Sequence, residues 1–201
     1  MTAPADIEPA GAPVRHHPLR RALHWAMAII VIGMVPAGIY FTDFDNRPAI
    51  EAAFGPGSFD HFYNLHKAVG IVALALALWR IWARRRHPDP AYAVPLTEMQ
   101  AQMSRLAHRL IYVLLVLTPL LGWAGVSAFP APLPFFGLFE VPKILPPNRE
   151  LAEVLLFWHK FCALSLAALA IVHIGAALHH RARGDGVFQR MGLRWKDFTR
   201  S

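Results

Sequence analysis

Residues 158–180 read WHKFCALSLAALAIVHIGAALHH, and this stretch decides the fold. Between Lys160 and Arg181 the chain has no Asp, Glu, Lys or Arg. A helix rises about 1.5 Å per residue, so about 20 apolar residues cross the roughly 30 Å hydrocarbon core of a bilayer. The stretch also contains His159 and His173, and ionisable side chains inside a span are rare and usually functional. It therefore predicts a membrane-spanning helix that carries part of a functional site.

Three other stretches lack charged residues, at 22–42, 68–79 and 110–139. The middle one is short, but Lys67 and Arg80 can extend their charged ends toward water from a longer helix. A soluble bundle would show a polar stripe on each helix, and these segments are apolar nearly all round. A cleaved signal peptide would have a shorter apolar core than the first stretch and a small-residue cleavage site. We predict an all-α, integral membrane four-helix bundle with spans at about 22–41, 62–83, 106–126 and 155–179.

Charge distribution predicts the orientation. The chain has 201 residues, 55% hydrophobic and only 16% charged, with a formal net charge of +7. Fifteen of its 20 Lys and Arg residues fall in the tails or near the segment that joins the second and third spans. The positive-inside rule then puts both termini in the cytoplasm, with a tail at 1–21, the membrane domain at 22–180 and a basic tail at 181–201. Because the arginines follow topology, the basic charge does not indicate nucleic-acid binding.

The spacing of the histidines predicts two stacked pairs. His159 and His173 are 14 residues apart, which is close to four full helical turns, so both face the same side about 21 Å apart along the axis. Each needs a partner at its own depth on another helix. By depth, His66 at the start of the second span matches His159, the outer pair. His24 at the start of the first span matches His173, the inner pair.

Such pairs are suited to haem iron, because neutral imidazole is a good axial ligand and an apolar bundle dissolves a porphyrin. Two axial histidines favour electron transfer over oxygen chemistry. A zinc or copper site would gather three or four ligands at one depth, and the single cysteine excludes the CxxC and CxxCH motifs. His108 competes for the inner site and is otherwise expected to contact a haem propionate or a quinone. Arginine forks pair well with carboxylates, so three arginines are candidate propionate partners: Arg20, Arg21 and Arg105.

Several short segments together resemble the bacterial cytochrome b561 family over about residues 19–192. They are Leu23-His24-Trp25, Asn64-Leu65-His66-Lys67, the run from Leu106 to Tyr112, Trp158-His159-Lys160, Ile171-Val172-His173 and Leu178-His179-His180. The resemblance implies a multi-pass protein of the bacterial inner membrane with two b-type haems. It also implies that the haem irons are ligated by the residues matching His24, His66, His159 and His173.

The resemblance further implies superoxide oxidation coupled to ubiquinone reduction. Lys67 and Lys160 each follow a predicted outer ligand, and with Lys143 and Arg149 they could attract an anion, although the outer loop at 42–61 is acidic. One alternative is a b-type subunit that links a separate dehydrogenase or hydrogenase to the quinone pool, and so has a redox protein partner. Another is a non-redox metal or proton carrier that uses the same histidines.

Overall fold

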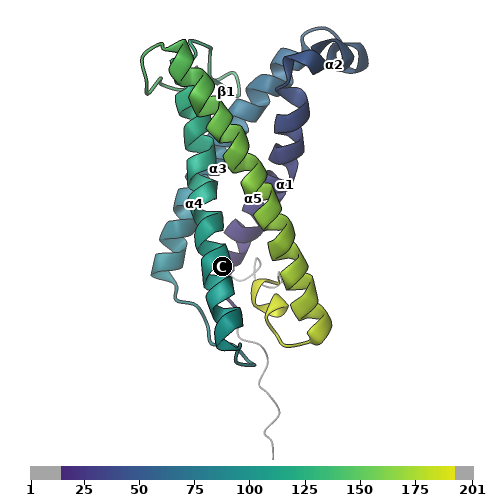
Figure 1. Cartoon of the computed structure of the whole chain (residues 1–201), viewed down its shortest axis with the longest axis vertical. Coiled ribbons are helices and arrows are strands. Elements are labelled where there is room, and N and C mark those ends of the chain that lie inside the picture. Colours follow the sequence, from purple (N-terminus) through teal and green to yellow (C-terminus); the bar gives the residue numbers. More distant parts are fainter. Residues whose placement is uncertain (1–14, 193–201) are drawn as a thin grey trace, which may run out of the picture.

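The four predicted spans are four long helices in the computed structural model, which describes residues 15–192 (Figure 1). They are α1 (Pro18–Phe41), α3 (Ser58–Arg86), α4 (Glu98–Ala128) and α5 (Arg149–Arg183). All four are long and apolar enough to cross a membrane. Each begins or ends several residues beyond its predicted apolar core, because helices continue past the hydrocarbon into the polar layer. The outer parts of the predicted tails 1–21 and 181–201, namely residues 1–14 and 193–201 with Arg194, Lys196 and Arg200, lie outside the described residues.

Local sequence explains where the long helices begin and end. Pro18 occupies the first turn of α1, where its missing N–H costs nothing. Thr97 and Gln100 form a reciprocal capping box at the start of α4. The Asn148 side chain caps α5, which ends at Gly184 in a left-handed conformation. The helices α1 and α4 continue through the internal prolines Pro36 and Pro119.

The helices pack as two pairs, with α1 along α3 and α4 along α5. Contacts between α3 and α4 join the pairs, while α1 and α5 touch more sparingly. Many large apolar side chains point away from the bundle, among them Ile29, Val113 and Ile171. Outward-facing apolar surface along the full length of four helices is what a lipid bilayer covers. The chain is therefore a four-helix membrane bundle.

One end of the bundle, here called the loop end, has short elements in both of its connections that the sequence did not predict. The connection after α1 contains η1 (Phe44–Asn46) and the short helix α2 (Arg47–Phe54). The connection after α4 forms a hairpin of β1 (Pro134–Phe135) and β2 (Phe139–Glu140). Phe136 and Gly137 both adopt positive φ in the three-residue loop between the strands, as the two central residues of a type I′ turn do.

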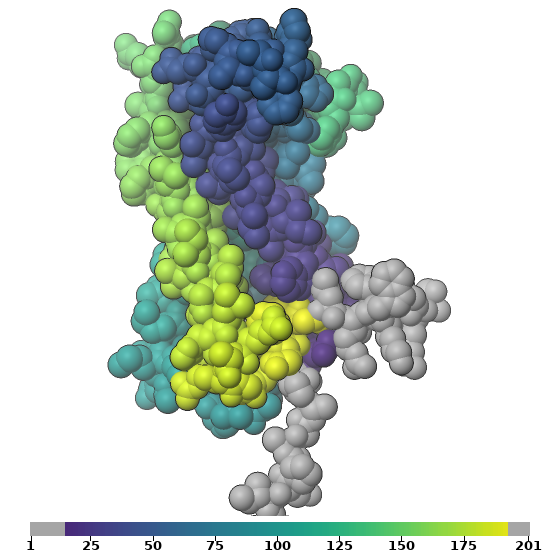
Figure 2. Space-filling view, turned by 90° about the vertical axis from the view of Figure 1, so that its right-hand side faces the viewer, coloured from purple at the N-terminus to yellow at the C-terminus, as the bar shows by residue number. Residues whose placement is uncertain are grey.

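The opposite end, here called the tail end, is closed by the last described residues. The turn η2 (Phe188–Met191) lies against the start of α1, where the two ends of the colour scale meet in Figure 2. The Gly192 carbonyl accepts hydrogen bonds from Arg15 and Arg21, at 3.1 and 2.6 Å. The Trp25 indole N–H donates to the Met191 carbonyl at 2.9 Å. We call residues 188–192 in this position the C-terminal clasp.

Candidate functional site

Three of the four long helices contribute histidines to two ring pairs inside the bundle: α1 and α3 contribute one each, and α5 contributes two. At the loop end, the centroids of the His66 and His159 rings are 6.2 Å apart with an interplanar angle of 88°. At the tail end, the centroids of His24 and His173 are 6.1 Å apart at 83°. The partners are those that helical spacing predicts, although the ring geometry alone does not say what the pairs bind.

The ring spacing is what one metal ion between two imidazoles requires. A metal–nitrogen bond of about 2 Å and about 1.1 Å from nitrogen to ring centroid, counted on both sides, give roughly 6 Å. The stacked pair His17 and His87 is closer, with centroids 3.7 Å apart, whereas edge-to-face ring contacts lie at about 4.5–7 Å. The spacing of both intramembrane pairs is thus compatible with an ion between the rings and also with direct edge-to-face contact.

Glycines and a backbone carbonyl support the loop-end rings. A Cβ atom added at Gly38 would lie 2.9 Å from His66 Cε1, and one added at Gly122 would lie 2.9 Å from His159 Nδ1. Each ring thus fits where only a glycine leaves space. His159 Nδ1 is 2.8 Å from the Thr118 carbonyl oxygen, so this nitrogen carries the proton and donates, which leaves Nε2 free as a ligand.

A cavity of about 540 Å³ adjoins the loop-end pair. It runs between the helix pairs from Met27 and Leu166 to Lys67 and Lys160, and its walls are mostly apolar. His66 Nδ1 and the Thr118 hydroxyl are buried there without a hydrogen-bond partner. Buried polar atoms without partners are rare in native proteins and call for an explanation. An apolar chamber with two histidines suits a flat, largely apolar group that carries a metal ion.

Side chains, rather than glycines, surround the tail-end pair. His24 Nδ1 is 2.9 Å from Nη1 of Arg80, which must be the donor because a guanidinium has no acceptor. Arg80 Nε also donates to the Tyr112 hydroxyl at 3.1 Å. From the sequence, Arg80 is expected only to extend its charged end toward water at the membrane surface. Its position in α3, at the depth of His24, was the signal available in the sequence.

His108 is a third histidine at the tail end, with its ring centroid 5.3 Å from that of His173. Its Nδ1 lies 2.6 Å from the Ser104 carbonyl oxygen, one helical turn earlier, so its Nε2 is free. That makes His108 a competent ligand by protonation state, but its ring is closer to His173 than two metal–nitrogen bonds allow. The ring spacing favours His24 as the partner of His173, and the protonation state favours His108. The spacing decides, because a proton moves between ring nitrogens more easily than a helix shifts its position.

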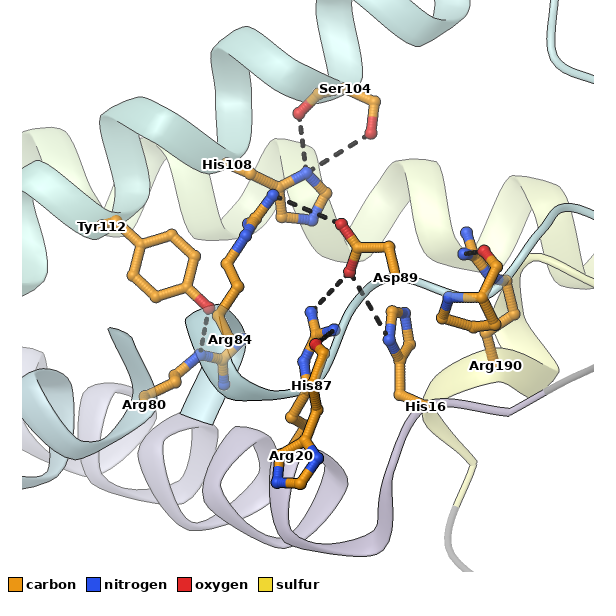
Figure 3. Close-up of polar contacts among 11 residues, drawn as sticks. His16, Arg20, Arg80, Arg84, His87, Asp89, Ser104, His108, Tyr112 and Arg190 are labelled. Atoms are coloured by element: carbon orange, nitrogen blue, oxygen red, sulfur yellow. Dashed lines mark hydrogen bonds and ion pairs between the residues drawn. The ribbon is translucent and has the colours of Figure 1, made fainter. Parts of the chain in front are cut away.

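The three arginines predicted to pair with propionates have other partners or are exposed to solvent. Arg20 donates to the His87 carbonyl at 2.8 Å and pairs with Asp89 at 2.6 Å (Figure 3). Arg21 holds the C-terminal clasp, and Arg105 is exposed. Arg84 approaches the other oxygen of Asp89 at 3.6 Å. These contacts join α1, the connection after α3 and the clasp, as Figure 3 shows for Arg20, Asp89 and Arg190.

Electrostatics at this junction keep His16 neutral. Burial, and then the nearby charges of Arg20 and Arg190, lower the pKa of His16 to about 4. Its backbone N–H donates to the Arg190 carbonyl at 3.1 Å. Burial acts to raise the pKa of Asp89, but the hydrogen bond and charge of Arg20 outweigh it and lower that pKa.

The remaining histidines lie away from the two pairs. His61 is in the first turn of α3 rather than in a loop, and it is exposed, as is His179. His180 Nδ1 pairs with Asp185 at 2.6 Å. Cys162 is buried and free. Within residues 15–192, no cluster of three or more His, Cys, Asp or Glu side chains has the arrangement of a metal site.

Comparisons with known proteins agree with this architecture. Residues 15–193 match the family described as prokaryotic cytochrome b561. The chain is 29% identical to cytochrome b561 homolog 2 of Escherichia coli K12 over 184 residues, covering 89% of this chain and 92% of that protein. It is 26% identical to the probable superoxide oxidase CybB of Yersinia pestis over 175 residues, 86% and 93% of the two chains. Cytochrome b561 homolog 1 of E. coli K12 is 30% identical over 132 residues, 65% and 74%.

Proposed function

Because this chain belongs to the prokaryotic cytochrome b561 family, we propose that it holds two b-type haems, one at each end of the bundle. Membership implies haem b and electron transfer within the bacterial inner membrane. In the proposal, His66 and His159 ligate the loop-end haem, and His24 and His173 ligate the tail-end haem. The observation that carries it is the shared spacing of the two ring pairs, 6.2 and 6.1 Å.

Haems held by the imidazoles of these four histidines would supply the exchange of single electrons. The chain's own groups hold and orient these imidazoles. The Thr118 carbonyl fixes the His159 proton on Nδ1, and Gly38 and Gly122 let the rings of His66 and His159 enter the bundle. At the tail end Arg80 donates to His24 Nδ1, so His24 would ligate through Nε2 only with its proton moved to Nδ1 and Arg80 turned to another acceptor.

The orientation follows from the arginines. With the tail end in the cytoplasm, the exposed arginines at the ends of α3 and α5 lie on the side that the positive-inside rule favours. The loop end, with its cavity, then faces the opposite side of the membrane. Electrons entering at the loop end would cross the bilayer along the bundle axis.

The proposed reaction takes one electron from each of two superoxide ions, which leave as dioxygen, and reduces one ubiquinone with two protons to ubiquinol. Three features support superoxide as the donor. One relative is named a probable superoxide oxidase. Lys67 and Lys160 line the cavity. Arg47 pairs with Glu51 and Asp60 at 3.1 and 2.7 Å, which offsets part of the acidic charge of that loop.

The test mixes purified, lipid-embedded protein with a superoxide source, with and without ubiquinone. We expect superoxide loss to accelerate when quinone is present, with ubiquinol formed at one per two superoxide ions. Haem reduction without a quinone-dependent acceleration would contradict the proposed substrate pair. Co-purification of a second redox subunit that reduces the haems would instead support the role of a b-type subunit in a larger dehydrogenase.

The role of the cavity lysines is tested separately with Lys160→Gln. Lys160 is exposed and lines the cavity, so loss of its charge should slow superoxide capture several-fold at low salt and less at high salt. Lys143→Gln is the matched control, because it removes an exposed lysine at the same end that does not line the cavity. Equal effects of the two variants would contradict steering by the cavity.

A further inference from the structure

Arg80 is a cation inside the bundle that has no acidic partner among the described residues. It lies in α3 between Trp79 and Ile81, and its side chain is half-buried. Within residues 15–192, no Asp or Glu lies at ion-pair distance from Arg80. A guanidinium at membrane depth is costly unless an anion or several acceptors satisfy it.

Other arginines of the molecule do form ion pairs with carboxylates. Arg20 and Arg84 share Asp89, Arg47 pairs with Glu51 and Asp60, and Arg149 pairs with Glu153. These arginines lie in or near the connections and helix ends, where Arg47, Arg84 and Arg149 are partly or fully exposed to water and Arg20 is buried. Among the residues that the structure describes, Arg80 instead hydrogen-bonds to the neutral partners His24 and Tyr112.

Further donors gather around Arg80. The guanidinium carbons of Arg80 and Arg84 are each 5.4 Å from the centre of the Tyr112 ring, so two positive groups lie against one ring (Figure 3). The Tyr112 hydroxyl accepts from Arg80, which leaves its own O–H proton available to donate. A planar guanidinium fork beside a second cation and a hydroxyl donor is a good receptor for a carboxylate.

We propose that Arg80, assisted by Tyr112 and Arg84, binds a carboxylate of the porphyrin held at the tail end. This inference rests on the proposed function, since it takes His24 and His173 as the ligands of that haem. Haem b carries two propionate side chains and no other charged substituents, and Arg80 lies at the depth of His24. The assignment replaces the arginines suggested by the sequence, whose guanidinium groups are bound to Asp89, backbone carbonyls or solvent.

The experiment measures haem retention in a His159→Ala background, in which the proposed function leaves only the tail-end haem. The protein is loaded with haem or with haem dimethyl ester, whose propionates are uncharged, and haem transfer to an excess of apomyoglobin is timed. Arg80→Gln should speed the loss of natural haem about tenfold or more, because a charge-assisted, two-pronged contact is lost. With the ester, the same substitution should change the rate much less.

The ester comparison separates carboxylate binding from a role in orienting His24. If Arg80 acts only through the His24 ring, Arg80→Gln will speed the loss of both haems equally, and the proposal is overturned. Arg80→Lys keeps the charge without the fork and should give an intermediate rate with natural haem. Arg86→Gln is the matched control on the same helix, since Arg86 is exposed over Trp82 at 5.9 Å, and it should leave both rates unchanged.

Failure of this proposal is distinguishable from failure of the proposed function. A His159→Ala protein that binds no haem would contradict the ligand assignment itself. A protein that keeps its haem, and loses haem and ester at rates that Arg80→Gln does not change, would contradict only the role of Arg80.

Discussion

The two ends of the bundle hold histidine rings at nearly the same spacing by different means. At the loop end, the backbone provides the support: the glycines behind His66 and His159 and the Thr118 carbonyl. At the tail end, His24 contacts the Arg80 side chain, and the C-terminal clasp closes the bundle nearby. The difference shows that one ligand spacing can be built from rigid backbone contacts or from a charged side-chain network. The ring spacing at the loop end should therefore be sensitive to steric substitutions, and the spacing at the tail end to changes of charge.

Removing a ligand tests the division into two sites and should have the largest effect. His159→Ala should lose the loop-end haem and keep the other, and His173→Ala should do the reverse. Each variant should therefore bind one haem per chain, as measured by haem extraction against protein mass. His61→Ala removes an exposed histidine near the same end as a control. Two haems in either ligand variant would refute the pairing.

The choice between His24 and His108 sharpens the tail-end assignment. His24→Ala should lose the tail-end haem, since its ring has the 6.1 Å spacing to His173. His108→Ala should retain both haems, because its ring is 5.3 Å from His173 and sits beside the pair. Haem content and the low-spin electron paramagnetic resonance signals of the two sites report the outcome. The opposite result would make His108 the ligand.

Steric substitutions should harm the loop end selectively. Gly38→Ala and Gly122→Ala each place a Cβ within about 3 Å of a histidine ring, and overpacking of this kind costs about 1–3 kcal/mol. The loop-end haem should therefore dissociate at a lower temperature than in the wild-type protein. Haem absorbance recorded during heating measures this temperature. Gly33→Ala and Gly175→Ala meet no atom within 4 Å and should be neutral or slightly stabilising, because alanine favours helix. A uniform response of all four variants would contradict the backbone support.

Acid should loosen the tail end selectively. The pKa of His16 is about 4 in the folded protein and near 6.5 when unfolded, so the unfolded state binds more protons between these values and stability falls as pH falls. Between pH 7 and pH 5, the free energy of unfolding should fall by about 2 kcal/mol at most.

Hydrogen exchange of residues 188–192 measures this loss, because the clasp is tied to His16 through Arg190. His16→Gln should flatten the pH dependence, whereas His61→Gln should not. Equal protection factors at pH 5 and pH 7 in the wild-type protein, after correction for the intrinsic exchange rates, would show that His16 does not govern the clasp.

The spans and the histidine pairs could be predicted because they depend on the length of the charge-free stretches and on the helical repeat. A charge-free stretch must be long enough to cross the membrane, and 14 residues return a helix to nearly the same face. The helices are longer than predicted because capping groups such as Thr97 and Asn148 lie outside the apolar core. The short helix α2 and the β1–β2 hairpin depend on local turn geometry within connections that the sequence marks only as loops.

The supports of the rings could not be predicted for a physical reason. Helices that are apolar all round carry no periodic signal for their rotation, so the sequence does not say that Gly38 and Gly122 face histidines while Gly33 does not. Arg80 reads as a charge at the end of a span, and only the packing of α3 against α1 turns it toward His24. The roles of these residues depend on interhelical contacts rather than on period.

The most direct test of the central claim is the ratio of haem b to polypeptide in the purified wild-type protein, combined with resolution of its redox centres by potentiometric titration. The account predicts two haems per chain that titrate as two low-spin, bis-histidine centres. A fully folded protein with one haem or none, or with a five-coordinate iron, would contradict it.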